Sequence, residues 1–331
     1  MNWRITVASL ALVSACSLAY LHTPAEACLH PAAEFKYPIK AGSQRGLVMF
    51  HGGKQHLVVA PGYKVDGVPA AKIKNDAIEG LTSLAMIIPV PNLPESYAEA
   101  DGKLFDELDE FTEAAEVENT NRARRGAKGL ADSPSEDDQD GATFYESVKA
   151  GAYTIQPIKA SGEKGGIELN AWLSNNGFGA IGNDLLNYYM ENKFYWLAVK
   201  LNAERGLPVS GNLKPLHLTV ETEKPFFPLK IRAGEGEFDA ELWVICTEKI
   251  DLDKTKAFGL QTVEQRDNMF YQKNRTTKPE SLPQPAKALW DKFEMLKSPA
   301  EINCYRFYGA GLNKGGSLAK LEKDLTFEFK K

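Results

Sequence analysis

The sequence lacks the marks of a membrane-spanning or nucleic-acid-binding protein. Beyond Leu21 no apolar run approaches the roughly 18 residues that a helix needs to cross a bilayer, so we expect no transmembrane span in the rest of the chain. The formal net charge of −5 over 331 residues is small, whereas a protein that binds nucleic acid without sequence preference needs a basic face. We therefore expect no nucleic-acid partner.

Motifs of established catalytic chemistry are also missing. The chain has no Gly-x-Ser-x-Gly elbow around a serine nucleophile. The glycines at 162–166 predict a turn, but they are not followed by the Gly-Lys-Ser/Thr of a phosphate-binding loop. Aspartates and glutamates are numerous, but acid and base roles do not follow from their number. The sequence therefore predicts no catalytic residue and no cofactor.

The N-terminal segment has the pattern of a signal peptide. Arg4 provides a positive charge, an apolar run covers residues 5–21, and Ala25-Glu26-Ala27 places small residues where a signal peptidase cleaves. Residues 1–27 are therefore predicted to be a signal peptide. Export predicts an extracytoplasmic location, periplasmic, secreted or lipid-anchored, in an oxidising compartment.

Two questions about the exported chain stay open. Val13-Ser14-Ala15-Cys16 resembles the lipobox of bacterial lipoproteins, which would make Cys16 a lipid anchor at a new N-terminus. Cleavage after Ala27 would instead leave an odd number of cysteines, so at most one internal disulfide forms. These cysteines are Cys28, Cys246 and Cys304, and the sequence does not choose among the three pairings.

The same cleavage would place a histidine third in the exported chain. A free amine, the thiol of Cys28 and the imidazole of His30 would together suit copper or nickel, which favour square-planar nitrogen donors. Cys28 and His30 are therefore the candidate metal ligands. His51 and His56 flank a predicted hairpin turn, and we expect both on the surface, because the further Cys or His ligands of a structural zinc site are absent from their neighbourhood.

Short strands dominate the chain up to residue 102. Two apolar runs around His51-Gly52-Gly53 predict a β-hairpin. A third run at residues 84–88 ends at Pro89-Val90-Pro91, where missing N–H donors confine the segment to a strand end or an edge. Residues 103–117 then predict an amphipathic helix. Its apolar face is formed by Leu104, Leu108, Phe111 and Ala115, and its acidic face is expected in solvent.

A charged segment divides the chain. Residues 119–141 contain four basic residues followed by five acidic ones and almost nothing apolar, which is typical of a loop or a disordered insert. We therefore predict a signal peptide at 1–27, an N-terminal β-rich half with one amphipathic helix at 28–118, a charged insert at 119–142 and a C-terminal α+β half at 143–331. The two halves are compatible with one continuous domain.

Residues 167–201 carry the strongest folding signal. Apolar residues at 167–173 predict a short helix that ends at Asn175-Asn176-Gly177. Asn183 is predicted to cap a second helix that ends at Asn192. From residue 194 the period changes to two and both faces are apolar, which predicts a strand in the interior of a sheet. Nearly all aromatics of this stretch are thereby assigned to the core, which leaves Tyr188 and Tyr195 to test for exposure.

Later segments continue the β pattern. Residues 216–221 alternate between apolar residues and His217, Thr219 and Glu221, which predicts a half-buried strand with a wet face. Leu242, Val244 and Cys246 share a face, so Cys246 is expected to be buried or bridged. Residues 286–296 predict a helix, and residues 325–329 alternate as an edge strand does.

Three groups of residues together resemble one known family. They are Cys28 with Ile87-Ile88-Pro89-Val90-Pro91 and Leu-Phe-Asp-Glu-Leu at 104–108; Ala171-Trp172-Leu173 with Asn176-Gly177-Phe178, Tyr189 and the strand at 194–201; and Pro215-Leu216 with Lys-Pro-Phe-Phe-Pro-Leu at 224–229. In this order, over about residues 28–231, the chain resembles a bacterial family of exported proteins catalogued as domain of unknown function 2330. The resemblance implies no activity. The long charged insert and the lack of a C-terminal membrane span depart from the family and put a shared mode of anchoring in doubt.

The predicted fold class is α+β, mainly antiparallel sheets of short strands with a few packed helices, because strands outnumber helices and no βαβ rhythm recurs. We expect an exported, non-enzymatic protein that binds an unknown protein or cell-envelope partner. The alternative is a hydrolase or metal-dependent enzyme whose site assembles only in the fold. A deep pocket of His, Asp, Glu or Cys side chains would favour the enzyme, and a shallow surface with an aromatic patch would favour the binding protein.

Overall fold

The computed structural model describes residues 29–32, 34–113, 140–255, 261–262, 274–293, 295 and 298–330. The predicted signal peptide, Cys16, Cys28 and most of the predicted insert at 119–142 lie outside these residues. Within the described ranges, no helix is both long and apolar enough to cross a membrane.

Among the described residues, nine strands form the larger of the two main sheets. Their spatial order is β16, β18, β15, β2, β3, β13 and β7, with β12 beside β3 and β17 beside β18. The strands are β2 (Ile39–His51), β3 (Lys54–Val65), β7 (Ser96–Glu99), β12 (Ser210–Asn212), β13 (Leu216–Glu221), β15 (Phe238–Cys246), β16 (Gln261–Thr262), β17 (Arg275–Thr277) and β18 (Ile302–Leu312). β2 and β15 run parallel and the other neighbours are antiparallel. The predicted hairpin at Gly52-Gly53 joins β2 to β3 and is confirmed.

In the part of the chain that the structure describes, six strands form the smaller sheet, and all neighbouring strands in it are antiparallel. Their order is β1, β6, β11, β10 and β8, with β9 beside β10. The strands are β1 (His30–Pro31), β6 (Ser83–Val90), β8 (Gly141–Phe144), β9 (Val148–Ala150), β10 (Tyr153–Ser161) and β11 (Tyr195–Asn202). Because β11 lies between β6 and β10, the prediction of an interior strand after residue 194 is confirmed. Each sheet combines strands from both halves of the chain.

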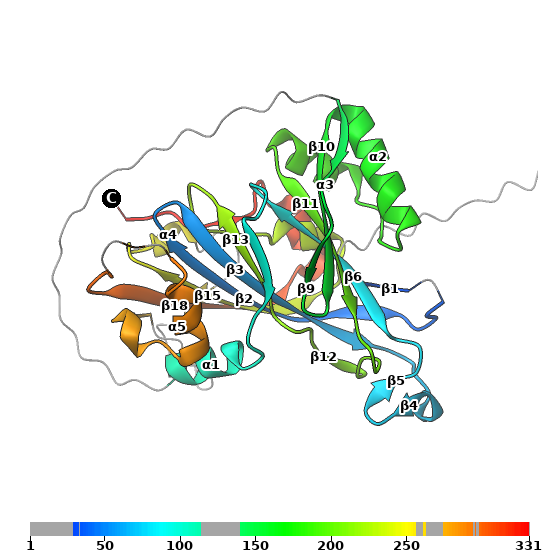
Figure 1. Ribbon diagram of the computed structural model, residues 1–331, viewed down its shortest axis with the longest axis horizontal. Helices are drawn as coiled ribbons and strands as arrows, with labels where there is room; N and C mark the ends of the chain where they lie inside the picture. Colours follow the sequence, from blue (N-terminus) through cyan, green and yellow to red (C-terminus); the bar gives the residue numbers. More distant parts are fainter. Residues whose placement is uncertain are drawn as a thin grey trace, which may run out of the picture.

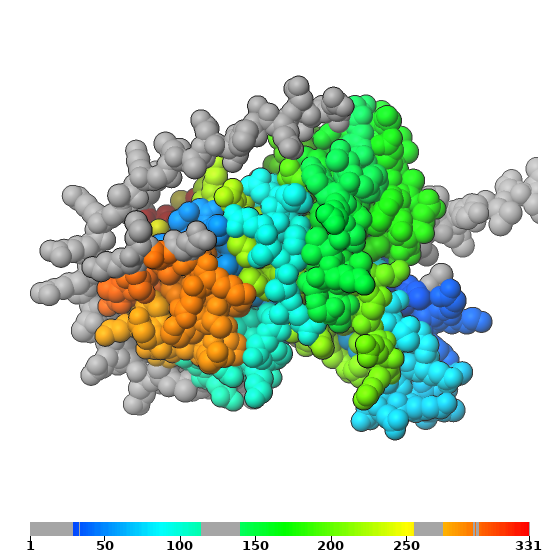
Figure 2. Space-filling model, viewed as in Figure 1, coloured from blue at the N-terminus to red at the C-terminus, as the bar shows by residue number. Residues whose placement is uncertain are grey.

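Helices cover the outer faces of both sheets (Figure 1). α2 (Gly162–Asn175) and α3 (Asn183–Glu191) pack on the smaller sheet, while α1 (Leu104–Glu113) and α5 (Gln284–Trp290) pack on the larger one. The order of layers is therefore helix, sheet, sheet, helix. Figure 2 shows the two helical layers on separate parts of the molecule, α2 and α3 in green and α5 in orange beside α1 in teal. The predicted α+β class with mainly antiparallel sheets is confirmed.

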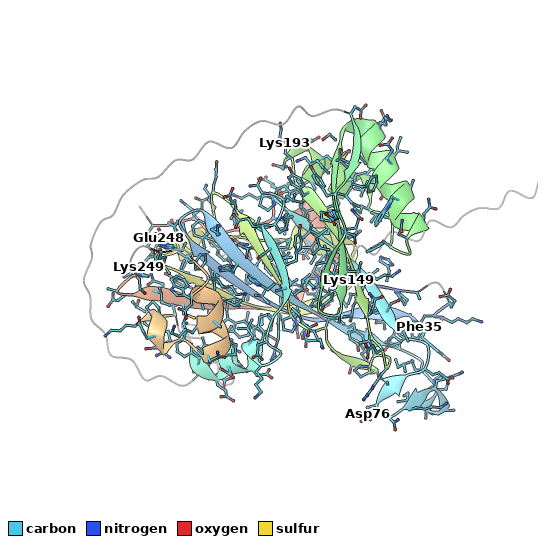
Figure 3. All side chains as sticks on the ribbon, viewed as in Figure 1. Phe35, Asp76, Lys149, Lys193, Glu248 and Lys249 are labelled. Carbon is cyan, nitrogen blue, oxygen red and sulfur yellow. The ribbon has the colours of Figure 1, made fainter. Side chains whose placement is uncertain are left out.

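Smaller elements complete the fold. They are β4 (Ile73–Lys74) and β5 (Ala77–Ile78), which form a separate hairpin; β14 (Phe226–Phe227) and β19 (Leu325–Thr326), which pair with each other; the short helix α4 (Leu252–Thr255); and the 3₁₀ helices η1 (Ala70–Lys72), η2 (Lys230–Gly234), η4 (Pro279–Ser281) and η5 (Lys314–Lys320). The β4–β5 hairpin projects from the body, and its turn residue Asp76 marks the tip in Figure 3.

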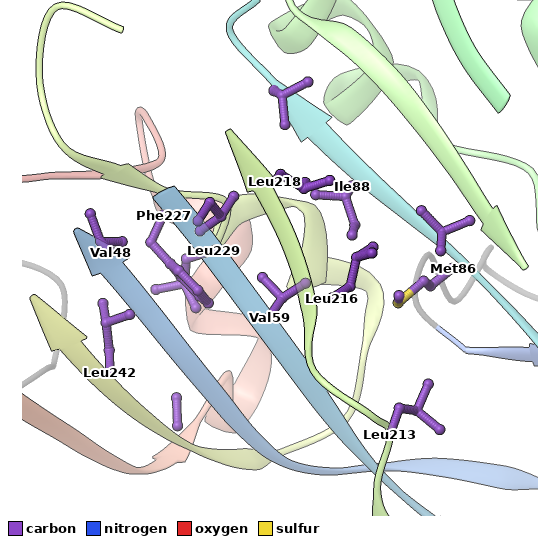
Figure 4. Packing of buried hydrophobic residues seen from close by; sticks show 14 of the residues in the cluster. Val48, Val59, Met86, Ile88, Leu213, Leu216, Leu218, Phe227, Leu229 and Leu242 are labelled. Atoms are coloured by element: carbon purple, nitrogen blue, oxygen red, sulfur yellow. The ribbon is translucent and has the colours of Figure 1, made fainter. Parts of the chain in front are cut away.

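Alternating side chains of the strands divide the buried apolar residues of the described ranges into three cores. Val48, Val59 and Leu216 of the larger sheet face Met86 and Ile88 of the smaller one in the core between the sheets (Figure 4). Because neighbouring strand residues point to opposite faces, the residues between them contribute to the outer cores. Leu47 and Val58 lie beneath α1 and α5, and Trp196 and Ala198 lie beneath α2 and α3.

Polar groups attach α1 to the larger sheet. Asp106 pairs with Arg45, whose Nη1 lies 2.7 Å from the carboxylate, and Asp109 pairs with Arg306. Nη1 of Arg306 also donates a hydrogen bond to Oγ1 of Thr112 at 3.2 Å. The apolar face of the predicted helix is confirmed by the buried Leu104 and Leu108. The acidic face, expected only in solvent, also makes ion pairs with the sheet.

The first turns of α2 occupy residues 162–166, so the turn predicted there is wrong. Glycine allows close packing on two sides of this helix. A Cβ atom on Gly165 would lie 2.5 Å from the carbonyl oxygen of Gly141, and one on Gly166 would lie 2.8 Å from Cδ2 of Leu186. α2 can therefore approach both β8 and α3. Asn192 ends α3 as predicted, but Gly182 rather than Asn183 is its N-cap.

The two described cysteines lie on opposite faces of the larger sheet. Cys246 on β15 is opposite Asn303 of β18, whereas Cys304 is opposite Ile245. Both are buried free thiols, Cys246 in the core between the sheets and Cys304 in the core beneath α5. The predicted burial of Cys246 is confirmed. Because the two side chains are separated by the sheet, they do not bridge each other.

Gly46 on β2 provides a test of the packing between the sheet and β14. A Cβ atom on Gly46 would lie 2.4 Å from Cε2 of Phe227. We expect Gly46→Ala to lower the free energy of unfolding by about 1–3 kcal/mol, because the phenyl ring must shift in a close-packed core. Urea denaturation followed by tryptophan fluorescence measures this loss. Gly102→Ala is the control, since its Cβ would meet no atom within 4 Å, and an equal loss in both variants would contradict the prediction.

Candidate functional site

His56 on β3 and His217 on β13 form a buried pair. Nε2 of His217 lies 3.0 Å from Nδ1 of His56, and this Nδ1 lies 3.1 Å from Oγ1 of Thr219. The hydroxyl of Ser96 donates a hydrogen bond to Oγ1 of Thr219 at 2.8 Å. The polar chain therefore extends from the exposed Ser96 into the interior. Phe293 packs against His56, with its ring centroid 4.3 Å from that of His56.

Burial keeps both histidines neutral. It lowers the pKa of His56 from the usual 6.5 to about 4, with smaller contributions from Lys292 and Lys54. It lowers the pKa of His217 to about 3, with smaller contributions from His56 and Lys292. A base with so low a pKa takes a proton from a serine poorly near neutral pH. The Ser96–Thr219–His56–His217 chain therefore does not support the chemistry of a serine hydrolase.

Two sequence predictions about these residues are wrong. His56, expected on the surface, is 1% exposed, and the supposed wet face of β13 is buried at His217 and Thr219. The segment after α5 folds over this face, and the local pattern of β3 and β13 does not reveal that cover. His51 is half-buried, with its ring 5.9 Å from that of Phe293. No group of three or more His, Cys, Asp or Glu suited to a metal is found in the described ranges.

The histidine pair predicts a loss of stability in acid. Both pKa values are lower in the folded chain than the usual 6.5, so the unfolded chain binds protons more tightly. The free energy of unfolding therefore falls as the pH decreases from about 6.5 towards about 4, by about 2 kcal/mol per histidine at about pH 5. Urea denaturation of the wild type and of His56→Gln/His217→Gln across this range measures the difference. Parallel pH profiles for the two proteins would contradict the assignment.

A second polar site is an open groove of about 780 Å³ between α2 and α3. Its walls are formed by residues that recur at helical spacing along α2 and α3, on the sides where the two helices face each other. From α2 they are Glu163, Gly166, Ile167 and Asn170, and from α3 they are Asn183, Leu186, Asn187, Met190 and Glu191. Lys193 follows α3 and also lines the groove, at the place labelled in Figure 3. We call this site the α2/α3 groove.

The α2/α3 groove combines an apolar strip with an acidic rim. The apolar strip is formed by Leu186, Met190 and Ile167, and the side chain of Ile167 is 65% exposed. Among the described residues, Leu93 and Phe144 are the other large exposed apolar residues, at 37% and 42%. The rim is formed by the carboxylates of Asp140, Glu163 and Glu191 and by the ammonium of Lys193. Three negative charges against one positive charge leave the groove with a net charge of −2.

Asn170 holds the connection between the two walls in place. Its Oδ1 accepts a hydrogen bond from the backbone N–H of Ile181 at 2.8 Å, and its Nδ2 donates one to the carbonyl of Ile181 at 2.9 Å. Ile181 is buried in the core beneath the helices. Together with the close contact at Gly166, this double hydrogen bond positions α2 and α3 before any ligand arrives, which reduces the loss of entropy on binding.

The remaining sequence candidates lie outside this groove. Tyr188 and Tyr195 are each half-buried and lie beneath a lysine, with Nζ of Lys230 4.9 Å from one ring centroid and Nζ of Lys159 4.2 Å from the other. The most exposed aromatic of this lobe is instead Phe144, which packs against Trp172 at 5.6 Å. Sequence periodicity did not single out the groove, because its walls belong to two helices.

His30 lies on β1, opposite Ala85 of β6. Its imidazole rests against Gly179, where a Cβ atom would lie 2.2 Å from Nε2. With Glu34 and Lys200 it lines a smaller pocket of about 330 Å³. Cys28 lies outside the described residues, so the metal site of Cys28 and His30 stays a prediction.

The fold and the groove define a four-layered α+β protein with an open acidic groove on one helical lobe. Residues 71–269 match the family described as "Uncharacterized protein conserved in bacteria", DUF2330. The chain belongs to this family, and the resemblance inferred from the sequence is confirmed. The matched segment contains the whole α2/α3 groove but begins after Cys28.

Known structures resemble the chain only remotely. The crystal structure of baculovirus P35 is 11% identical with a TM-score of 0.36, over 89% of this chain and 98% of that chain. A mutated baculovirus P35 after caspase cleavage is 11% identical with a TM-score of 0.35, over 86% and 99%. At these values the likeness assigns no function to this chain. No curated protein matches the sequence.

Proposed function

We propose that this DUF2330 protein is an exported, non-enzymatic binding protein of the bacterial cell envelope. Its binding site is the α2/α3 groove, and its partner is a positively charged, partly apolar segment of another protein. The export pattern at residues 1–27 supports the location. The observation that carries the binding role is the groove itself, with its acidic rim and its exposed isoleucine.

The size and shape of the groove suit a protein segment. Ligand sites commonly have volumes of about 300–1,000 Å³, and the groove has about 780 Å³. It is open along the two helices rather than enclosed, so it can receive side chains from an extended or helical segment that lies across it. A small molecule would remain largely in solvent there.

The chemistry of the lining specifies the partner. Glu163 on α2 and Glu191 at the end of α3 present carboxylates from opposite walls, so lysine or arginine side chains complement the rim. Between them, the apolar side chain of Ile167 is exposed to solvent. Burying such a side chain against a partner contributes about 1–2 kcal/mol to the free energy of binding. The partner therefore combines basic residues with at least one aliphatic residue.

Binding of a labelled model peptide tests this proposal. A short fluorescein-labelled peptide of alternating lysine and leucine is titrated with the protein, and fluorescence anisotropy reports Kd. We expect Glu163→Gln/Glu191→Gln to weaken binding about 3- to 10-fold, since each exposed ion pair contributes roughly 0.2–1 kcal/mol. The difference should shrink at high salt, which screens exposed charges. Ile167→Ser should weaken binding about 5-fold through the loss of apolar contact.

Matched controls separate the groove from general attraction to an acidic protein. Glu280→Gln removes an exposed carboxylate, and Leu93→Ser an exposed apolar residue, both outside the groove. These variants should bind the lysine–leucine peptide as the wild type does. A glutamate–leucine peptide should bind the wild type far more weakly than the lysine–leucine peptide does. Equal Kd values for the groove variants and the controls, or equal binding of the two peptides, would overturn the proposal.

A further inference from the structure

A buried carboxyl group lies behind the groove, on the opposite side of α3. Asp324 is 2% exposed. Its Oδ1 accepts hydrogen bonds from Oη of Tyr189 at 3.0 Å and from the backbone N–H of Lys230 at 2.8 Å. Its own backbone N–H donates to Oη of Tyr188 at 2.9 Å. Its second oxygen, Oδ2, has no hydrogen-bond partner in the part of the chain that the structure describes.

These contacts join three elements that are distant in sequence. Tyr188 and Tyr189 belong to α3, Lys230 begins η2, and Asp324 precedes β19 near the C-terminal end of the described chain. Nζ of Lys230 also contacts the carbonyl of Leu321, which lies on the same segment as Asp324. We call the group of Asp324, Tyr188, Tyr189 and Lys230 the α3 anchor. It attaches the back of α3 to η2 and to the C-terminal segment.

The anchor and the groove occupy opposite sides of one helix. With 3.6 residues per turn, Leu186, Asn187 and Met190 face the groove, whereas Tyr188 and Tyr189 face the anchor. Among the described residues, Asp324 makes hydrogen bonds with Tyr188, Tyr189 and Lys230, which do not line the groove. Asp324 acts on the groove through the position of α3, which forms a whole wall.

The titratable groups that face Asp324 are those of the α3 anchor. Burial raises the pKa of Tyr188 to about 12 and that of Tyr189 well above its usual value, so both phenols stay neutral donors or acceptors. Burial also raises the pKa of Asp324 to about 7 from 3.8, against the opposing effects of its hydrogen bonds and of the Lys230 ammonium. The carboxyl thus changes its charge near neutral pH while it remains enclosed.

We propose that the α3 anchor is a proton-dependent latch: protonation of Asp324 holds α3 in place, and its ionisation loosens α3 and with it one wall of the groove. Ionisation leaves a full negative charge on a buried carboxylate whose Oδ2 has no hydrogen-bond partner among the described residues, and this disfavours the closed form. The effect of a loosened groove wall on ligand binding rests on the proposed function of the groove. The latch itself does not depend on that function.

The sign of the pH dependence follows from linkage. When α3 and the C-terminal segment separate, Asp324 meets solvent and regains its usual pKa of 3.8, below the value of about 7 in the closed form. The closed form therefore binds the proton more tightly. Between about pH 4 and about pH 7 the equilibrium constant for opening rises about tenfold per pH unit, and above about pH 7 it is constant.

Amide hydrogen exchange of the full chain tests the latch without any ligand. Peptides that cover α3 and residues 321–330 are followed by mass spectrometry from about pH 5 to about pH 8, and the rates are corrected for the intrinsic pH dependence of exchange. We expect the opening constant of these peptides in the wild type to rise roughly a hundredfold from about pH 5 to about pH 7 and then to level off. In Asp324→Asn, which keeps the Oδ1 acceptor but cannot ionise, it should not change with pH.

Two further variants make the result specific. Glu322→Gln removes an exposed carboxylate two residues away and should keep the pH profile of the wild type. Tyr189→Phe removes a hydrogen bond that lowers the pKa of Asp324, so its profile should level off at a higher pH. This second variant still reports on the carboxyl if Asp324→Asn does not fold. A flat profile in the wild type, or the same slope in Asp324→Asn, would overturn the latch.

The peptide titration distinguishes the two proposals. If the lysine–leucine peptide does not bind while exchange in α3 keeps its pH dependence, the proposed function fails and the latch stands. If the peptide binds as expected while exchange in α3 is independent of pH, the latch fails and the proposed function stands.

Discussion

Burial of both faces of both sheets is the constraint on which the rest of this structure depends. The two sheets pack on each other through their inner faces, and α1, α5, α2 and α3 cover the outer faces. Most central strand positions therefore have no solvent side. A polar side chain on such a strand must find a partner within the protein, because an unpaired polar group in the interior costs about 1–3 kcal/mol. The buried polar clusters of this fold are the result.

The buried polar clusters next to α1, α5 and α3 meet this constraint with different chemistries. Beneath α1, Arg306 satisfies its guanidinium with Glu241, Asp109 and Thr112, and so ties the helix to the sheet. Near α5, His56 and His217 remain neutral, and one ring nitrogen of each lies within hydrogen-bond distance of the other. Behind α3, the carboxyl group of Asp324 accepts hydrogen bonds from the hydroxyl of Tyr189 and from the backbone N–H of Lys230. Charge pairing, neutral pairing and a hydrogen-bonded buried carboxyl group thus lie next to the helical layers at three places among the described residues.

The same constraint explains which parts of the fold could be predicted from the sequence. β11 was predictable because both of its faces are apolar, and this pattern directly reports double burial. β13 was not, since His217 and Thr219 have the alternation of a wet face and the cover supplied by Phe293 comes from a distant segment. The first turns of α2 were mistaken for a turn because its glycines serve close helix packing rather than chain reversal. The local pattern does not distinguish these two uses of glycine.

The groove was even less accessible to sequence reasoning. Its walls belong to two helices whose facing sides depend on Gly166 and on the double hydrogen bond of Asn170 to Ile181. One local signal exists: Ile167 lies on the polar side of α2, away from the buried Leu169 and Leu173. An apolar residue on a polar helical face is a sign of a binding surface only once the neighbouring helix is known. Charge complementarity likewise depends on Glu163 and Glu191, which are 28 positions apart in the sequence.

The buried titratable groups give the two helical lobes opposite responses to pH. The histidines on the α5 side have lowered pKa values, so acid weakens the packing of that lobe. The carboxyl on the α3 side has a raised pKa, so acid strengthens its attachment. Between about pH 4 and about pH 6.5 the two effects partly cancel in the global free energy of unfolding, but they do not cancel locally because they act on different sheets. A change of pH in this range therefore redistributes stability between the lobes, and the lobe that gains rigidity in acid is the one that carries the groove.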